Sequence, residues 1–204
     1  MSDQDHWNHV YETKASDAVS WFQPAPRTSL ALLDAAGLNR TSCVIDVGGG
    51  DSRLADSLVD RGLECITVLD ICTAAIARAR TRLGSREGRV NWIVGDVTGE
   101  WAAAPQNFWH DRAMYHFLVD ERDRARYVER LRQVLTPGGH AIIATFAPDG
   151  PTKCSGLPVM RYSAESLQAA LGADFVMVQS LLEPHATPTG TTQSFLFAVF
   201  RKVD

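Results

Sequence analysis

The 204-residue sequence lacks three things: an excess of positive charge, a long apolar run, and the cysteine spacings of common metal sites. Lys and Arg number 20 and Asp and Glu number 24, which gives a formal charge of −4. Because domains that hold nucleic acid through its phosphates are usually basic, we expect no nucleic-acid partner. The longest apolar runs, such as residues 195–200, fall far short of the roughly 20 residues that span a bilayer, so no membrane segment is expected.

The four cysteines are Cys43, Cys65, Cys72 and Cys154. No two of them form C-x-x-C, which argues against a zinc site and against a thioredoxin-like redox pair. The N-terminus has neither the basic start nor the apolar core of a signal peptide. We therefore expect a cytoplasmic, reducing environment in which these thiols are free, and we expect no metal.

From residue 43 onward, short apolar runs alternate with stretches whose apolar residues recur at helical spacing. Strands are expected at residues 43–47, 65–69, 90–94, 108–109, 140–146, 175–181 and 194–201, and helices at 29–37, 52–61, 73–83, 121–135 and 163–171. This alternation predicts an α/β fold with a doubly wound, mostly parallel seven-stranded sheet. The last two strands have no helix between them, which indicates a C-terminal antiparallel hairpin. Residues 1–27 would form a cap or lid before one domain at 28–204.

A glycine loop follows the first predicted strand, at the edge of the sheet where ligands bind in such folds. Residues 46–50 read Asp-Val-Gly-Gly-Gly, and glycines let a ligand approach the backbone closely. The dinucleotide pattern G-x-G-x-x-G needs its third glycine where Arg53 stands, and Asp46 is badly placed beside a phosphate. An acid at this position suits a ligand with an ammonium group, whose carboxylate can meet the amides of the loop.

Two further carboxylates follow strands. Asp70 closes the second strand, twenty positions beyond Gly50, where a carboxylate can accept both hydroxyls of a ribose. Asp96 follows the third strand, where it can accept from the exocyclic amine of a purine. A role as a helix N-cap would explain Asp70 alone, but the glycine loop at this spacing favours the ribose.

Together these features resemble the class I S-adenosylmethionine-dependent methyltransferases. Residues 46–50 resemble the family's acidic glycine-rich loop, and residues 135–139, Leu-Thr-Pro-Gly-Gly, match its turn before the fifth strand. Asp70 matches the ribose-binding acid and Asp96 matches the residue that contacts adenine. One departure is Ser52, which stands where the family often has another glycine.

The resemblance implies a Rossmann-like methyltransferase fold that binds S-adenosyl-L-methionine and releases S-adenosyl-L-homocysteine, with no metal. The cofactor-binding residues that it implies are Trp21, Asp46, Gly48, Gly49, Gly50, Asp70, Ile71, Asp96 and Val97.

In this family the segment after the fourth strand faces the methyl group, and here it is rich in titratable side chains. We take His110, Asp111 and His116 as the catalytic candidates, because a base is needed when the acceptor must lose a proton. The structural alternatives are that Asp111 pairs with Arg112 and that His116 packs on the next helix.

Two residues are candidates for contacting the acceptor. Tyr115 lies in the same segment, and Arg161 lies in a loop after the fifth strand, where it can clamp a carboxylate. The aromatic residues of the N-terminal segment can fold over the cofactor as a lid, or they can cover the sheet edge as an amphipathic helix.

We expect methyl transfer to an oxygen, nitrogen or sulfur atom of a small-molecule acceptor. The chain lacks the Asp/Asn-Pro-Pro-Tyr/Phe tetrapeptide that in this family marks methylation of bases and amides. One alternative is a protein lysine methyltransferase, since some lysine-specific branches share a Tyr/Trp N-terminal segment and a loop like residues 48–52. Another is an S-adenosylmethionine-binding protein without catalysis. The oligomeric state is left open.

Overall fold

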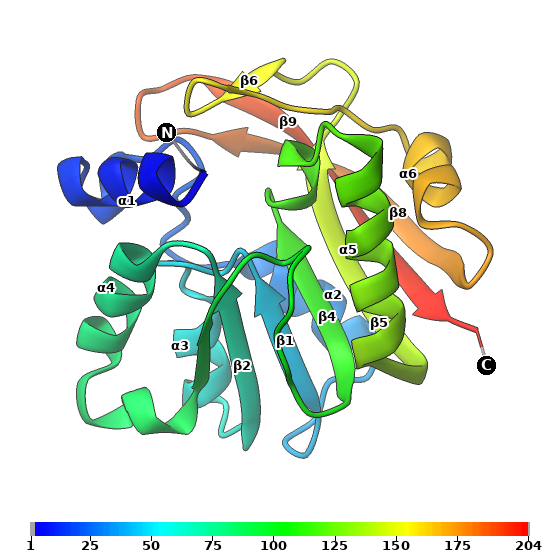
Figure 1. The fold of residues 1–204 in the computed structure, drawn as a ribbon, viewed down its shortest axis with the longest axis horizontal. Coiled ribbons are helices and arrows are strands. Elements are labelled where there is room, and N and C mark those ends of the chain that lie inside the picture. Colours follow the sequence, from blue (N-terminus) through cyan, green and yellow to red (C-terminus); the bar gives the residue numbers. More distant parts are fainter. Residues whose placement is uncertain (1–2, 204) are drawn as a thin grey trace.

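The computed structural model describes residues 3–203, with a seven-stranded sheet at the centre of the fold (Figure 1). The strand order is β3-β2-β1-β4-β5-β9-β8. The strands are β1 (Cys43–Val47), β2 (Cys65–Asp70), β3 (Asn91–Val94), β4 (Gln106–Arg112), β5 (Leu135–Phe146), β8 (Phe175–Ala186) and β9 (Thr192–Lys202). β9 pairs antiparallel with both β5 and β8, whereas β1 to β5 pair in parallel. The predicted α/β sheet with a C-terminal hairpin is confirmed.

Helices cover both faces of this sheet (Figure 1). They are α1 (Asp3–Thr13), α2 (Arg27–Ala35), α3 (Leu54–Asp60), α4 (Thr73–Leu83), α5 (Glu121–Val134) and α6 (Ala164–Leu171). Leu33 of α2 and Leu58 of α3 belong to one apolar cluster, and Leu131 of α5 and Leu167 of α6 belong to the other. The sheet therefore separates two cores, as a doubly wound fold requires.

The pleat of β1 decides which side chains meet on each face. Val44 belongs to the α2–α3 cluster and Ile45 to the α5–α6 cluster, because successive strand residues point to opposite faces. Asp46 thus shares the face of Val44, and the register sets it beside His110 of β4. A polar pair is in this way buried next to the start of the glycine loop.

Several elements differ in extent from the sequence prediction. β4 begins at Gln106 and β5 begins at Leu135, directly after α5, instead of after the Pro-Gly-Gly turn. The turn residues lie within β5, and the β4–β5 register shifts beside them, between Gln106 and Phe108. Gly139 is needed there, because a Cβ on it would lie 2.9 Å from the carbonyl oxygen of Asn107. A small hairpin, β6 (Lys153–Cys154) and β7 (Leu157–Pro158), forms inside the segment expected to be a loop.

The N-terminal segment lies across one end of the sheet (Figure 1). Helix α1 packs beside α4, where the Oδ1 atom of Asn8 accepts a hydrogen bond from the Thr73 hydroxyl at 3.2 Å. A short 3-10 turn, Ser16–Ala18, connects α1 to the segment before α2. Within residues 3–203, no helix combines the length and the apolar character that crossing a membrane requires.

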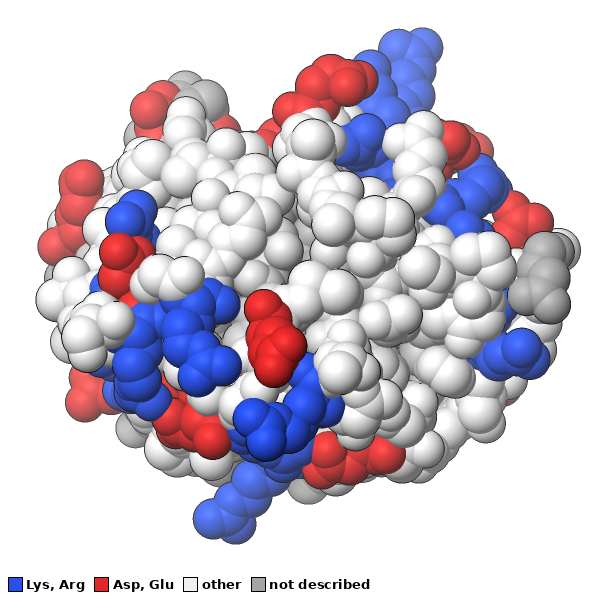
Figure 2. Space-filling model, turned by 90° about the horizontal axis from the view of Figure 1, so that it is seen from below, with Lys and Arg blue, Asp and Glu red and all other residues white. Residues whose placement is uncertain are grey.

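Several arginines in and next to the helices pair with carboxylates. Arg61 donates to Asp34 at 2.6 Å, and the Nε atom of Arg80 donates to Glu87 at 2.9 Å. Figure 2 shows positive and negative side chains intermingled on the face seen from below, with uncharged surface between them. The basic residues of this face therefore form no continuous positive field.

Cys43 and Cys65 correct the expectation of four free thiols, because they form a disulfide. The register places these two residues opposite each other at the starts of β1 and β2, with their Cα atoms 4.6 Å apart. That separation lies within the range a disulfide requires. Cys72 and Cys154 are free and buried.

We predict that two thiols of the purified protein react with an alkylating reagent after unfolding in urea, and that four react when a reductant is added first. Intact-mass spectrometry counts the adducts. Four adducts without reductant would show that Cys43 and Cys65 are not joined.

Candidate functional site

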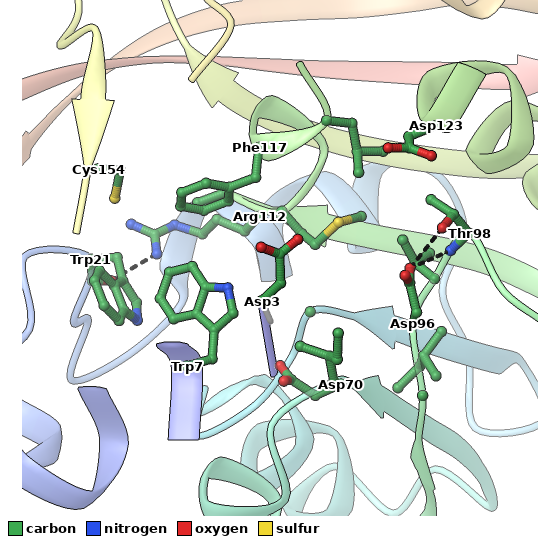
Figure 3. A pocket seen from close by; sticks show the side chains of 18 of the residues that line it. Asp3, Trp7, Trp21, Asp70, Asp96, Thr98, Arg112, Phe117, Asp123 and Cys154 are labelled. Carbon is green, nitrogen blue, oxygen red and sulfur yellow. Dashed lines mark hydrogen bonds between the residues drawn. The ribbon is translucent and has the colours of Figure 1, made fainter. Parts of the chain in front are cut away.

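A cavity of about 240 Å³ opens at the carboxyl ends of the central strands (Figure 3). Its walls come from α1, the segment before α2, the loops after β1, β2 and β3, the segment after β4, the start of α5, and β6. The residues that line it include Trp7, Tyr11, Trp21, Gly48, Asp70, Ile71, Asp96, Val97, Arg112, Met114, Phe117 and Cys154. The cavity therefore sits where ligands bind in a doubly wound sheet.

The loop after β1 needs its glycines because other groups approach it closely. Gly48 and Gly50 have φ values of +64° and +41°, in the left-handed region that glycine tolerates. A Cβ on Gly48 would lie 2.6 Å from the Cβ of Met114, and one on Gly50 would lie 2.9 Å from the Oδ2 atom of Asp70. The loop is thus pressed between the wall after β4 and the carboxylate at the end of β2.

Asp46, near the end of β1, forms hydrogen bonds through both of its carboxylate oxygens and so fixes the start of this loop. Its Oδ1 atom lies 2.7 Å from Nδ1 of His110, and its Oδ2 atom accepts from the Ser52 hydroxyl at 3.0 Å. Nε2 of His110 lies 2.9 Å from the hydroxyl of Ser29 in α2. Since an ionised carboxylate only accepts, the proton of a neutral His110 sits on Nδ1 and Ser29 donates to Nε2.

Asp70 presents a carboxylate to the cavity from the end of β2. Its Oδ1 atom accepts from the Cys72 amide at 2.7 Å, which leaves lone pairs on both oxygens for a ligand. Burial raises the pKa of Asp70 to about 7, against the lowering effect of the Cys72 amide, and the charge of Asp46 raises it further. Asp70 is therefore poised to ionise fully when a donor arrives.

The residues after β2 and β3 complete the wall on this side. Ile71 and Val97 line the cavity next to Asp70 and Asp96. The exposed carboxylate of Asp96 accepts from the amide and the hydroxyl of Thr98, at 2.8 and 2.9 Å (Figure 3). Six of the nine predicted cofactor residues line this cavity: Trp21, Gly48, Asp70, Ile71, Asp96 and Val97. Asp46 and Gly49 instead border a smaller adjoining cavity of about 60 Å³.

The three catalytic candidates lie behind the wall of the main cavity rather than on it. His110 borders the smaller cavity and is engaged by Asp46 and Ser29. Asp111 is fully buried and accepts from the amides of Met114 and Tyr115 at 3.0 to 3.2 Å.

Asp111 also does not pair with its sequence neighbour Arg112, because adjacent strand residues point to opposite faces. Its remaining partner is the Tyr127 hydroxyl, which donates at 2.8 Å. Burial raises the pKa of Asp111 to about 6, although the amide of Met114 acts against this. These contacts shape the turn at Ala113, whose φ of +68° is unusual for a residue with a side chain.

His116 is also enclosed. Its Nδ1 atom accepts from the Phe146 amide at 3.4 Å, and its ring packs against Phe117 and Phe146 at centroid distances of 4.6 and 4.7 Å. Burial, and then the charge of Arg112, lower the pKa of His116 to about 3. His116 is accordingly neutral near pH 7. Its ring packs in the core against Phe117 and Phe146, whereas its structural alternative expected packing on the next helix.

Neither predicted acceptor-contacting residue reaches the cavity. Tyr115 is fully buried, and burial raises the pKa of its hydroxyl. Arg161 is exposed and donates to the carbonyl oxygens of Pro148 and Gly150 at 2.7 and 3.3 Å. Its guanidinium therefore braces the loop after β5.

Arg112 is one of the cavity residues that were not predicted from the sequence as site residues. It follows His110 and Asp111 at the end of β4, and its side chain enters the cavity between Trp21, Phe117 and Cys154 (Figure 3). Burial lowers the pKa of its guanidinium to about 10, so it is charged near pH 7. Because successive residues of a strand point to opposite faces of the sheet, the sequence could have indicated that Arg112 and Asp111 lie on different faces.

Aromatic rings close the cavity on the side of the N-terminal segment. Trp7 meets Trp21 and Phe117 edge to face, with centroids 5.7 and 5.1 Å apart. The indole nitrogen of Trp21 donates to the Tyr11 hydroxyl at 3.3 Å. Residues of α1 thus form part of the cavity wall. No group of three or more possible metal ligands occurs in the part of the chain that the structure describes.

We predict that Asp70→Asn changes how folding stability depends on pH. Because the folded pKa of about 7 lies above the ordinary 3.8, the folded state keeps a proton that the unfolded chain releases. The parent therefore loses stability as the pH rises from about 4 to 7, and the Asn variant lacks this loss. Urea unfolding at several pH values should show that the free energy of unfolding of the variant increases relative to that of the parent as the pH rises to 7. Parallel curves would contradict the raised pKa.

Sequence comparison places this geometry among known proteins. A family described as a methyltransferase domain matches residues 44–139. Uncharacterised methyltransferases of Mycobacterium bovis and Mycobacterium tuberculosis are 35% identical over 117 residues, which is 57% of this chain and 56% of each relative. The match thus spans just over half the length of these relatives.

Structural comparison shows the fold alone, since the identities are low. N-methyltransferase NodS from Bradyrhizobium japonicum in complex with S-adenosylhomocysteine has a TM-score of 0.72 at 18% identity, over 98% of this chain and all of that one. A Burkholderia thailandensis 1,6-didemethyltoxoflavin-N1-methyltransferase has a TM-score of 0.72 at 22% identity, over 96% and 81% of the two chains. Residues 44–139 therefore match a methyltransferase domain, and the chain has the fold of S-adenosylmethionine-dependent methyltransferases.

Proposed function

We propose that the protein transfers the methyl group of S-adenosylmethionine to an oxygen, nitrogen or sulfur atom of a small-molecule acceptor. The observation that carries this proposal is that Asp96, Asp70 and Gly48 line one cavity. These residues suit the three parts of the cofactor: the adenine amine, the two ribose hydroxyls and the amino-acid end.

Asp70 is well suited to the ribose. A diol offers two donors, and an ionised carboxylate accepts both in a bidentate arrangement. The raised pKa means that the empty site holds this charge only partly near pH 7, so a bound diol stabilises the ionised form. Gly48, without a side chain, leaves space for the rest of the ligand to pass close to the backbone.

S-adenosylmethionine supplies an electrophilic methyl group, and transfer breaks its carbon–sulfur bond as the bond to the acceptor atom forms. For a displacement of this kind, the protein contributes mainly alignment of the two reactants. We assign His110 and Asp111 to positioning: His110 holds Asp46 under the loop, and Asp111 holds the turn at Ala113. A base is required only when the acceptor carries a proton that must leave.

The enclosure of the cavity supports a small acceptor. Residues of α1 and Trp21 form part of the cavity wall, and we propose residues 1–27, of which the structure describes 3–27, as the lid of the site. An extended protein substrate would need an open groove on this side. The structural neighbour that is named for didemethyltoxoflavin agrees with small-molecule chemistry.

Calorimetric titration with S-adenosylhomocysteine tests the proposal. We expect micromolar binding by the parent, about −8 kcal/mol, and at least tenfold weaker binding by Asp70→Ala. Asp149→Ala, which removes an exposed carboxylate outside the cavity, serves as the matched control and should bind like the parent. Affinity should also improve as the pH rises through 7, where Asp70 ionises.

Turnover separates the remaining alternatives. With S-adenosylmethionine as donor, we expect methylation within a panel of small acceptors and none on a lysine peptide array. Tight binding with no turnover on any acceptor would favour a non-catalytic binding protein. A folded parent that binds neither S-adenosylmethionine nor its demethylated product would contradict the proposed function.

A further inference from the structure

The guanidinium of Arg112 is anchored at one nitrogen and unsatisfied at the other two. Its Nη1 atom donates to the carbonyl oxygen of Trp21 at 2.8 Å. Its Nε and Nη2 atoms are shielded from solvent and have no hydrogen-bond partner among residues 3–203. No ion pair to Arg112 forms within the same residues. Leaving a buried cation with unused donors is unfavourable, and it calls for a partner that arrives from outside.

The two unsatisfied atoms lie on the same edge of the guanidinium. Nε and Nη2 point in parallel, so together they match the two oxygens of a carboxylate. The anchor at Nη1 holds the planar group, and the Phe195 ring backs it with its centroid 5.0 Å from Cζ of Arg112. Such a preformed fork loses little conformational freedom when it binds an anion.

The guanidinium of Arg112 lies on the side of the cavity away from Asp70 and Asp96 (Figure 3). Arg112 starts in β4, and its guanidinium reaches Phe195 of β9, across β5. Asp70 and Asp96 belong to β2 and the segment after β3, in the opposite direction along the sheet. Figure 3 shows Arg112 directed toward Cys154 and away from Asp70 and Asp96.

The nearby acids do not satisfy this cation. Glu183 and Asp46 act on Arg112 through their charge but form no ion pair with it. Glu183 accepts from Gln23 at 3.3 Å and from the hydroxyl of Thr28. Asp46 is engaged by His110 and Ser52.

Aromatic groups complete the surroundings of the fork. Trp7, Trp21 and Phe117 line the cavity beside Arg112 and meet one another through Trp7. Flat apolar walls next to a planar cation favour a flat ligand with one anionic end.

We propose that Arg112 binds a carboxylate of the methyl acceptor, so that the acceptor class is small planar or aromatic carboxylic acids. The inference rests on the proposed function, since it assigns the second substrate of the same site. Because Nε and Nη2 are shielded from solvent, the acceptor reaches them only when neighbouring side chains move aside.

The test uses benzoate as the anionic probe and benzamide as its neutral counterpart of the same shape. Binding of each probe to the protein saturated with S-adenosylhomocysteine is followed by calorimetry and by the side-chain resonance of Arg112 Nε–H. We expect benzoate to bind at least tenfold more tightly than benzamide. Arg112→Met should abolish this preference while S-adenosylhomocysteine affinity stays within threefold of the parent.

Two further variants sharpen the test. Arg126→Met removes another cavity-lining arginine, which is exposed and pairs with Asp123 at 3.4 Å, and it should keep the preference for benzoate. Arg112→Lys keeps the charge without the fork and should lose most of the preference. Circular dichroism establishes that each variant is folded, and Arg112→Lys keeps the proposal testable if Arg112→Met does not fold.

Three results would overturn the inference. One is a parent that binds S-adenosylhomocysteine but binds benzoate no better than benzamide, or not at all. Another is a preference that survives in Arg112→Met. The last is an Arg112→Met variant that loses affinity for S-adenosylhomocysteine but not for methylthioadenosine, which lacks the amino-acid end; this would assign the fork to the cofactor's own carboxylate. Failure of the parent to bind S-adenosylhomocysteine would instead mark failure of the proposed function.

Discussion

The buried carboxylate of Asp46 is the constraint on which the site depends. Burying a charge is unfavourable unless polar partners surround it, and here two direct partners and one indirect partner come from different elements. His110 approaches from β4, Ser52 from the loop, and Ser29 reaches the assembly from α2 through His110. Satisfying one carboxylate thus ties β1, β4, the glycine loop and the covering helix into one arrangement.

The position of the loop then determines the rest of the cavity. With Asp46 held below it, the loop passes so close to Met114 and Asp70 that only glycine fits at positions 48 and 50. Asp70 lies against this loop, and burial raises its pKa although the backbone amide of Gly50 acts against this. Asp111 fixes the segment after β4. It accepts hydrogen bonds from the amides of Met114 and Tyr115 and so keeps Met114 against the loop.

Two carboxylates of the cavity and its buried arginine lie apart along the sheet. Asp70 and Asp96 lie at the β2–β3 side, and Arg112 extends toward β9 at the other. A cationic donor and an anionic acceptor would each meet the complementary sign, and their mutual approach would be guided by this separation. The aromatic rings of Trp7 and Trp21, which come from the N-terminal segment, cover the junction between the two halves.

The fold was predictable because its signals are local. Buried parallel strands read as apolar runs, and the carboxylates at their ends follow at fixed spacing, so Asp70 and Asp96 were found from the sequence. The roles of His110, Asp111 and Arg112 were not accessible in this way. These roles differ because the three side chains do not all point to the same face of β4. They also depend on which residues of α2, α5 and β9 contact each side chain. The disulfide between Cys43 and Cys65 likewise depends on strand register, which apolar composition does not reveal.

A crystal structure of the protein with S-adenosylhomocysteine tests the central claim most directly. We expect the ribose hydroxyls to lie within hydrogen-bonding distance of both oxygens of Asp70. The adenine should lie beside Asp96 and Val97, the amino-acid end should lie next to Gly48, and Nε and Nη2 of Arg112 should remain unengaged by the ligand. A ligand bound elsewhere, or bound in this cavity with Asp70 apart from the ribose, would contradict the account.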